Sequence, residues 1–357
     1  MDTPTPIRGQ SADVQDCIEI APAVHGPSPK NPGGLPPGPL TTAELSAVVP
    51  DPRARGRYVR IWHGLYRRDD QVDDLRLRSA ALARTWPEGV LRGRSAALLW
   101  GDDSTPADAL PEIWLPSTRR SREGRVYRYG AMPPAAVTEL GGMRVTTPLR
   151  TCRDLACDLE FQDAVVAVER LCAVIPGLAG RLGAAAEHPS GRGARRFADV
   201  VTAVEPRSGS AESTRARLRL AASGFGGFSA GNRIRIAGRA MSLPLSDPAA
   251  RCVVVFSGGS TGPSDGVDTE HHRAALRRAG WTVIVVPGPS APGHAIPPAG
   301  GGVPPRGQAC DPGARGVLLA LRSLWPGTQL LPPLMGEPAA DPLGMWGIGA
   351  RGRDQRV

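Results

Sequence analysis

RCVVVFSGGST, residues 251–261, has the pattern of a buried strand that ends in a glycine-rich loop. Three consecutive valines precede a phenylalanine, and unbroken apolar runs of this kind are typical of strands covered on both faces. No charged residue follows Arg251 until Asp265. Two interpretations remain open for the loop: a nucleotide-binding cradle, or the end of a catalytic strand that has lost its acids.

The segments around this strand indicate an α/β layer. Their order is helix, three strands, helix, strand and helix. Gly224 is a natural stop for the first helix. The segments are AESTRARLRLAASGF (211–225), NRIRIAG (232–238), AMSLPL (240–245), the opening strand, TEHHRAALRRAG (269–280), WTVIVVPG (281–288) and ARGVLLALRSLW (314–325).

The region before this layer is predicted to be α+β with helices dominant. Thr147 before Pro148 fits a helix cap with proline at the first helical position. Helices are expected over 75–86 and 95–100 and in FQDAVVAVERLCAV, LAGRLGAAAEH and GARRFADVVTAV, and strands over 112–117 and 124–130.

The N-terminal part of the ordered chain has the outline of a winged helix. Thr41 and Glu44 have the spacing of a capping box on a short helix. GRYVRIWHGLYRR follows, and it is predicted to be a small hairpin with Gly64 at the bend.

Proline- and glycine-rich segments without apolar periodicity are expected to be disordered. They are a tail over 1–40, an insertion over 287–308 and a second tail over 327–357. The chain between the tails is predicted to form three domains, over 41–72, 73–205 and 206–326.

The charge balance suits a partner that carries phosphates. Lys30 is the only lysine among 43 basic residues, and the net charge is +9 with a pI near 9.9. Arginine pairs bidentately with phosphates and releases their counterions. A solvated basic surface gives the same total, so composition supports nucleic acid only weakly.

Cysteine usage and hydropathy exclude other classes. The six cysteines show no C-x-x-C pair and no histidine at zinc spacing. We find no signal peptide and no run of the ~20 apolar residues that a membrane span needs. A cytoplasmic protein without a membrane partner is therefore expected.

Six motifs stand in an order that is familiar from one protein family. They are GRYVRIWHGLYRR, LRGRSAALLWG, EIWLPSTRR, MRVTTPLRTCRDLA, AESTRARLRL and LRRAGWTVIVV. The chain over about 41–326 resembles a large actinobacterial family similar to the AbiEi antitoxins of type IV toxin-antitoxin systems. Its members end in a domain similar to the very-short-patch-repair endonucleases. The resemblance implies a winged-helix-like piece, a helical α+β middle domain and a restriction-endonuclease-like α/β domain.

In that family the winged helix binds operator DNA and represses its own operon. Here Pro50 and Pro52 stand where the recognition helix should run, so insertion into the major groove is doubtful. Contact with the DNA backbone stays open, as does a solvated basic hairpin. The candidate arginines are Arg53, Arg55, Arg57, Arg60, Arg67 and Arg68.

The resemblance extends to the middle domain. Its recurrent positions fall on Arg94-Ser95, Pro148, Arg150, Thr151 and Asp154. We expect a structural role, a capped helix whose Asp and Arg satisfy each other or the neighbouring loops, because no nucleophile and base accompany them.

A basic segment between the strands over 112–117 and 124–130 is a further candidate for DNA. Arg119, Arg120 and Arg122 could follow a phosphate backbone, together with Arg125 and Arg128. A charged hairpin tip is the commoner explanation for such a segment.

The terminal domain's relatives use a helix glutamate and three strand acids to bind Mg²⁺. Glu212 matches the helix acid, whereas Ser242, Val255 and Ser257 stand where the other acids are expected. A hard cation needs several oxygen ligands, so we expect no metal site. Substitute acids would require a different register, because Asp247, Asp265, Asp268 and Glu270 are predicted to lie in loops or at the next helix start. The glycines after Ser257 match neither a G-x-G-x-x-G nor a P-loop pattern.

The leading interpretation is a DNA-binding autoregulator with an inactive nuclease-like domain, no cofactor and a toxin as its protein partner. An active Mg²⁺-dependent DNA endonuclease that uses Glu212 is the main alternative. A non-functional remnant or interaction scaffold is a third.

Overall fold

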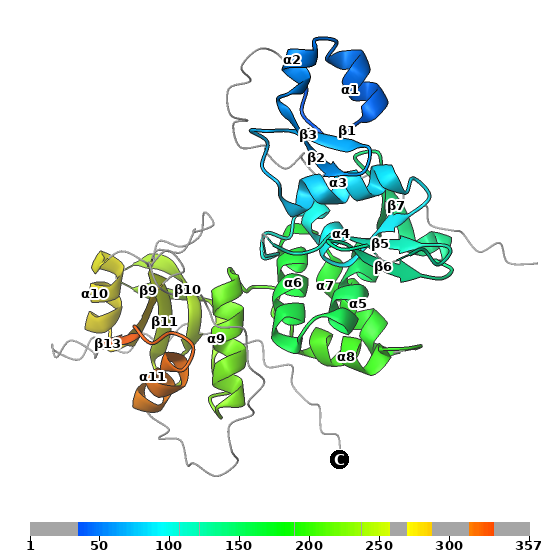
Figure 1. Cartoon of the computed structure of the whole chain (residues 1–357). Helices are drawn as coiled ribbons and strands as arrows, with labels where there is room; N and C mark the ends of the chain where they lie inside the picture. Colours follow the sequence, from blue (N-terminus) through cyan, green and yellow to red (C-terminus); the bar gives the residue numbers. More distant parts are fainter. Residues whose placement is uncertain are drawn as a thin grey trace, which may run out of the picture. The chain divides into compact units, whose positions relative to one another are not determined.

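The computed structural model describes residues 35–257, 270–287 and 314–331, apart from residues 107, 121, 189 and 237. Within these ranges the chain is α+β, with eleven α-helices and three sheets (Figure 1). It divides into two compact units after Gln71. No helix in the described ranges is long and apolar enough to cross a membrane.

Most of the segments expected to be disordered lie outside the described residues. This applies to 1–34, to 288–308 and to 332–357. The glycines that follow Ser257 are outside them too, so the nucleotide-cradle interpretation of that loop is not addressed by the structure.

The first unit combines a three-stranded sheet with two short helices. Helix α1 (Thr42–Val48) begins with the predicted capping box, in which Thr41 Oγ1 accepts from the Glu44 N–H and the Glu44 carboxylate accepts from the Thr41 N–H. Helix α2 (Pro52–Arg55) has only four residues and is capped by Asp51. The strands are β1 (Leu40–Thr41), β2 (Tyr58–Trp62) and β3 (Leu65–Arg68), in the order β1-β3-β2.

Gly64 forms the turn of the predicted β2–β3 hairpin. Its φ of 75° lies in the left-handed region, which glycine enters without steric cost. Leu45, Val49 and Tyr58 make the small core of this unit. The hairpin is therefore confirmed, and both preceding helices are short as expected.

Residues 35–40 belong to this unit, which corrects the tail expected over 1–40. Leu40 forms part of β1, and the Tyr58 hydroxyl donates to the Pro36 carbonyl at 2.7 Å. Proline lacks an N–H, but its carbonyl still accepts. A proline-rich segment can therefore be held at a sheet by donors from side chains.

The second unit contains two five-stranded sheets. The first has the order β6-β5-β4-β8-β7 and includes both parallel and antiparallel pairs. Its strands are β4 (Val90–Leu91), β5 (Glu112–Leu115), β6 (Val126–Tyr129), β7 (Val137–Leu140) and β8 (Met143–Thr146).

The basic segment between β5 and β6 is not a hairpin tip, because these strands are parallel. Ile113 pairs with Tyr127, and Leu115 with Tyr129. Parallel neighbours need a connection that returns to the starting end of the sheet. The segment over 116–125 is therefore a crossover.

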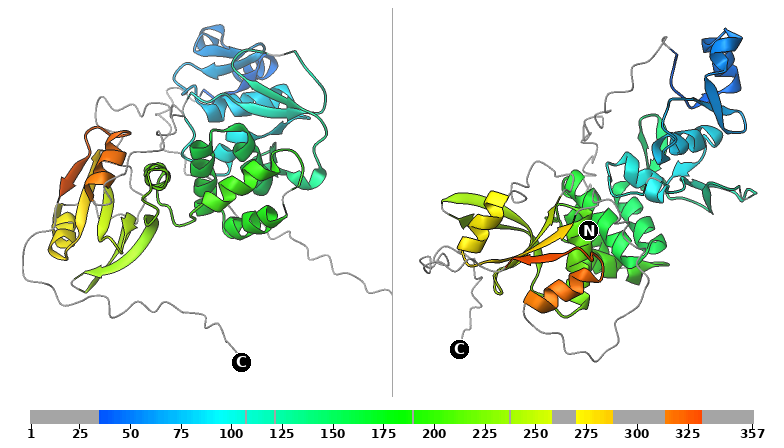
Figure 2. Two further views of the ribbon diagram at one scale, coloured as in Figure 1. Left: turned by 90° about the horizontal axis from the view of Figure 1, so that it is seen from below. Right: turned by 60° about the vertical axis from the view of Figure 1, so that its left-hand side comes forward.

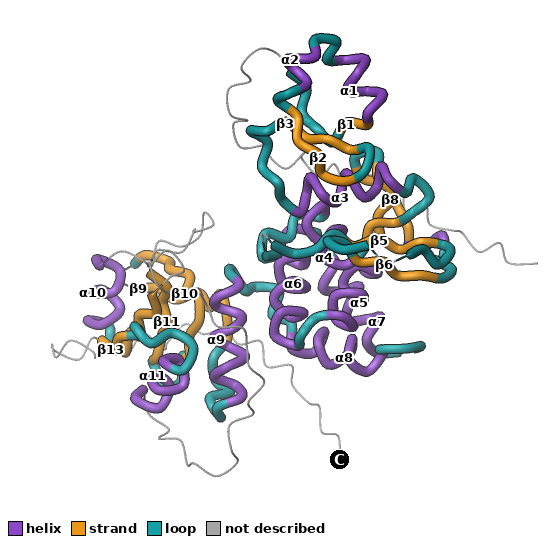
Figure 3. Tube along the Cα trace, viewed as in Figure 1, coloured by secondary structure: helices purple, strands orange, loops and turns teal. Residues whose placement is uncertain are grey.

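Six helices accompany this sheet, and Figure 3 shows the last four gathered beside it. Thr147 and Pro148 occupy the N-cap and first position of α5, as predicted, although the Thr147 side chain makes no cap hydrogen bond. The helices are α3 (Leu75–Thr85), α4 (Gly93–Leu99), α5 (Pro148–Asp158), α6 (Phe161–Val174), α7 (Leu178–Glu187) and α8 (Ala194–Ala203).

The opening stretch forms β11 (Cys252–Ser257), the central strand of the second sheet. Val253, Val254 and Val255 are fully buried, as the apolar run predicts. The order is β13-β12-β11-β10-β9, with β11 and β12 parallel. The other elements are α9 (Ala211–Ala222), β9 (Ser229–Ile236), β10 (Arg239–Asp247), α10 (Glu270–Arg278), β12 (Thr282–Pro287), α11 (Ala314–Arg322) and β13 (Gln329–Leu331).

Helices cover both faces of this sheet (Figure 2). On one face, Leu220 of α9 and Leu321 of α11 pack in a cluster with Val254. On the other face, Leu276 at the end of α10 packs in a cluster with Val255. Cover on both sides explains why the central strand is apolar without alternation.

Strand β13 corrects the tail expected over 327–357. Leu330 pairs with Ile284 of β12. A further strand of three residues therefore follows the last predicted helix and its turn. The backbone groups on the outer side of β12 would otherwise lack partners. A segment of three residues is too short to show a strand pattern in the sequence.

Candidate functional site

Two of the four positions that resemble a nuclease site, Glu212 and Val255, lie toward opposite faces of the sheet. Glu212 lies one helical turn before Ala216, which packs in the same cluster as Val254. Val255 lies in the opposite cluster, with Leu276. An acid at position 255 would therefore point to the face of the sheet opposite to the one that Glu212 approaches.

The two serines that replace strand acids are engaged in the sheet. Ser242 pairs with Arg233 of β9. The Ser257 hydroxyl donates to the Val286 carbonyl at 3.3 Å. Asp247, a potential substitute acid, accepts hydrogen bonds from the backbone N–H groups of the following turn.

No group of three His, Cys, Asp or Glu side chains that could hold a metal ion occurs among the described residues. Asp265 and Asp268, which could also have replaced the strand acids, lie outside them. Of the four positions implied by the resemblance, Glu212 alone is an acid, because Ser242, Val255 and Ser257 carry no carboxylate.

Several arginines of the first unit are committed to internal contacts. Arg57 pairs with Asp69 at 2.8 Å, and this hydrogen bond lowers the pKa of the Asp69 carboxyl. Arg55 donates to the Val49 carbonyl at 2.7 Å. These two guanidinium groups fix the ends of α1, α2 and the hairpin.

Arg68 is only 4% exposed. It forms an ion pair with Asp70 and donates to the Leu35 carbonyl at 2.7 Å. Arg68, one of the arginines predicted to contact the DNA backbone, therefore lies in the interior of the unit.

Arg53 and Arg60 are the exposed members of the set, and Arg67 is half-buried. Arg60 donates to the Trp62 carbonyl and lies 2.6 Å from His63 Nδ1, while Arg67 donates only to backbone carbonyls. Carbonyls do not neutralise a guanidinium, so these side chains keep their positive charge.

The crossover between β5 and β6 presents further arginines. Arg119, Arg120 and Arg122 are all exposed. Arg119 lies over the Trp86 ring, 5.2 Å from its centroid, and its carbonyl accepts from the Tyr129 hydroxyl at 2.8 Å. These contacts hold the segment against the sheet.

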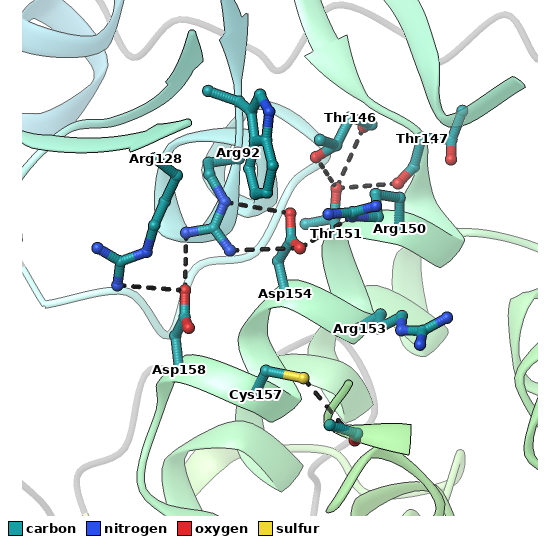
Figure 4. Close-up of polar contacts among 12 residues, drawn as sticks. Arg92, Arg128, Thr146, Thr147, Arg150, Thr151, Arg153, Asp154, Cys157 and Asp158 are labelled. Atoms are coloured by element: carbon teal, nitrogen blue, oxygen red, sulfur yellow. Dashed lines mark hydrogen bonds and ion pairs between the residues drawn. The ribbon is translucent and has the colours of Figure 1, made fainter. Parts of the chain in front are cut away.

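A buried ionic network occupies the centre of the middle region (Figure 4). Arg92 is 2% exposed and contacts three carboxylates. Its Nη1 lies 3.0 Å from Glu112 Oε2 and 2.7 Å from Asp158 Oδ2, and its Nη2 lies 3.2 Å from Asp154 Oδ1. The network joins the start of α4, strand β5 and helix α5.

Gly93 makes this approach possible. Its φ is 51°, and a Cβ there would lie 2.5 Å from Glu112 Oε2. The Arg94 N–H donates to Glu112 Oε1 at 3.0 Å. Burial raises the pKa of the Glu112 carboxyl, and the charge of Arg92 opposes this.

Arg150 and Asp154 satisfy each other, as expected, with Nε and Oδ1 2.9 Å apart. Arg150 also lies over Trp114, 5.2 Å from the ring centroid. Thr151 and Thr146 share a hydrogen bond of 2.7 Å between their hydroxyls. These residues therefore have the structural role that the sequence predicted for the capped helix.

The sequence analysis missed Arg92 itself. The motif LRGRSAALLWG drew attention to Arg94 and Ser95, and Ser95 does contribute by accepting the Glu112 N–H at 2.8 Å. A usable signal was Arg92 at the N-cap of α4, where a serine or aspartate is usual. The partners of Arg92 lie 20 to 66 residues away in the chain.

A second buried network joins α6 to α9. Glu169 accepts from the Thr214 hydroxyl, from the Glu205 N–H at 2.7 Å and from Arg217 Nη2 at 2.6 Å. Burial raises the pKa of the Glu169 carboxyl. The network fixes the helix that bears Glu212 to the rest of the unit.

A scan against protein-family models and a search of curated proteins both find no match to this chain.

Proposed function

We propose that this chain is a DNA-binding autoregulator of the class that resembles AbiEi antitoxins. It acts in the cytoplasm, binds DNA near its own gene and has a cognate toxin as its protein partner. On this proposal the first 40 or so ordered residues are a degenerate winged-helix-like piece, and the terminal domain is nuclease-like and inactive. The order of the six motifs and the exposed arginines support it.

The crossover between β5 and β6 is the observation that carries the DNA proposal. Residues 116–125 contain four arginines and one glutamate. Arg120 and Arg122 are exposed, and no carboxylate partner is found for either among the described residues. Arginine forks at such a surface bind phosphate oxygens bidentately and release condensed counterions.

The proposal assigns these arginines to the phosphate backbone and not to base edges. Helix α2, with four residues, is about 6 Å long at 1.5 Å per residue, too short to lie along a major groove. Arg53 and Arg60 of the first unit supply a second set of exposed cations. Binding through phosphates depends strongly on salt and weakly on sequence.

An electrophoretic mobility assay over a range of salt concentrations tests this proposal. The probes are the DNA upstream of the gene and an unrelated duplex of equal length. We expect the slope of log affinity against log salt to fall in magnitude by about two in Arg120→Gln/Arg122→Gln, because each lost phosphate contact removes about 0.9.

Arg192→Gln/Arg195→Gln is the matched control, since it removes two exposed arginines of the same unit. We expect this variant to keep the slope of the unchanged protein. Equal loss in both variants, or no binding to either duplex at low salt, would remove the DNA proposal.

The proposed inactivity of the nuclease-like domain rests on the replacement of the three strand acids at Ser242, Val255 and Ser257. Plasmid incubated with the protein and Mg²⁺ is expected to remain supercoiled. Nicking that requires Mg²⁺ and disappears in Glu212→Ala would establish the alternative, an active endonuclease.

A further inference from the structure

A pocket of about 400 Å³ lies in the second unit. It opens between helix α5, the end of α7 and the start of α8. Its size falls within the range of sites that take small molecules.

Basic side chains line this pocket. Arg150, Arg153 and His188 line it, and none of its lining residues is an aspartate or glutamate. Figure 4 shows Arg153 turned away from the buried ionic network, whereas Arg150 points into it. In that network three arginines face three carboxylates, so Arg153 adds a charge that the network does not neutralise.

The N-terminus of helix α5 adds to this positive potential. Thr147 and Leu149 at the start of α5 line the pocket. Ala194 at the start of α8 lines it too, but its N–H already donates to the Gly191 carbonyl at 3.2 Å. Neither helix has a side-chain hydrogen bond at its N-cap. The first N–H groups of a helix and its dipole both favour a bound anion.

The rest of the pocket wall is apolar. Leu149, Ala185 and the buried Phe197 line it together with further alanine and proline residues. A bare inorganic ion would leave this wall in contact with water. An apolar wall beside a few polar groups is instead the usual lining of a site for an organic ligand.

We propose that this pocket binds a small organic anion, whose phosphate or carboxylate contacts Arg153 and whose body packs against Leu149 and Phe197. Arg153 Nη2 donates to the Ser190 carbonyl, and both residues line the pocket. His188 and the Ser190 hydroxyl stand beside it as further polar groups. The proposal is independent of DNA binding.

Isothermal titration of the full chain with three probes tests the proposal. Adenosine monophosphate carries a phosphate on a large body, benzoate carries a carboxylate on an apolar ring, and inorganic phosphate has no body. We expect one of the two organic probes to bind more tightly than inorganic phosphate. Which of them binds identifies the head group.

Arg153→Gln is expected to weaken binding of that probe by about tenfold, the scale of one lost charge-assisted hydrogen bond. Ala185→Phe fills the pocket without a change in charge and is expected to abolish binding. Arg196→Gln is the matched control: Arg196 also donates to backbone carbonyls near α5, but it does not line the pocket.

Thermal unfolding of each variant checks that it folds. If Arg153→Gln does not fold, His188→Gln replaces it, because His188 is exposed. The Arg120→Gln/Arg122→Gln variant is expected to retain binding of the probe, which separates this site from the DNA surface. Absence of binding by all probes, equal loss in Arg196→Gln, or a preference for inorganic phosphate would overturn the proposal.

Discussion

Arg92 shows how much one side chain contributes to this fold. It is buried and bonded to carboxylates from β5 and α5. Removing one partner from a buried network leaves the remaining charges without compensation. The large penalty comes from these stranded charges and not from the lost attraction alone.

Arg92→Met is therefore expected to lower the free energy of unfolding by about 3–5 kcal/mol, measured by urea denaturation. Arg78→Met is the control, because Arg78 pairs with Asp73 at 2.7 Å on the surface. Loss of that exposed pair should cost less than about 1 kcal/mol. Similar costs for the two variants would contradict the assigned role of Arg92.

The contribution of the buried Asp102 carboxyl to folding stability is expected to change with pH in the opposite direction to that of a salt-bridged carboxylate. Burial raises the pKa of Asp102, while hydrogen bonds from Ser104 and Thr105 oppose the shift. A raised pKa in the folded state favours the protonated form. The group's contribution to stability therefore falls as pH rises through the folded pKa, and it is recovered on acidification toward the ordinary value of 3.8.

Asp102→Asn removes this titration. We expect the stability of the variant relative to the unchanged protein to be highest at pH 7. This relative stability should decrease as the pH is lowered to 4. Urea midpoints of both proteins at pH 7, 6, 5 and 4 measure the difference. A difference that does not change with pH would show that Asp102 is not desolvated.

At the scale of elements, the sequence predicted the helix starts and the buried strand whose signals lie within a few neighbouring residues. The capping box of Thr41, Pro148 at the first turn of α5 and the apolar run of β11 were all confirmed. Strand β4 was missed because it has only two residues. The β7–β8 hairpin had a signal in Gly141-Gly142, whose φ values of 57° and 74° suit a tight turn, and it was overlooked.

Strand orientation and the ionic networks could not be predicted in this way. Whether β6 runs parallel or antiparallel to β5 is decided by the whole sheet and not by the segment between them. The Arg92 contacts join segments up to 66 residues apart. The candidate nuclease positions were assigned from motif order, but whether Glu212 and Val255 lie toward the same face of the sheet depends on the packing of α9 and α10.

The contact of α6 with α9 supplies a prediction for Thr214. Its hydroxyl donates to the buried Glu169 carboxylate, so Thr214→Val leaves that carboxylate short of a donor. The expected cost is about 1–3 kcal/mol. Hydrogen exchange should show reduced protection of the backbone amides of α9.

Thr202→Val serves as its control. The Thr202 hydroxyl is exposed and bonds only the Ala198 carbonyl one turn earlier in α8. A change within about 0.5 kcal/mol is expected for such a surface site. Unchanged protection of α9 in Thr214→Val would mean that the Glu169 network does not fix this helix.

At the scale of the whole molecule, the two units differ in how much core they contain. Over 35–71 the first unit buries Leu45, Val49 and Tyr58 as a cluster, and Leu65 besides. Chains below about 40 residues seldom fold without a disulfide, a metal or a partner. The second unit buries apolar residues on both faces of its second sheet and in its first sheet, where Leu91, Ile113 and Val145 are fully buried, and should fold without the first unit.

A chain that begins at Val72 is therefore expected to retain a cooperative urea transition, whereas an isolated 35–71 peptide should show none. The same shortened chain assigns the DNA surface to one unit. If the crossover arginines provide the main phosphate contacts, it should bind DNA with most of the original salt dependence, because Arg119, Arg120 and Arg122 remain. If its binding is lost while Arg120→Gln/Arg122→Gln in the full chain binds normally, the phosphate contacts belong to the β2–β3 hairpin instead.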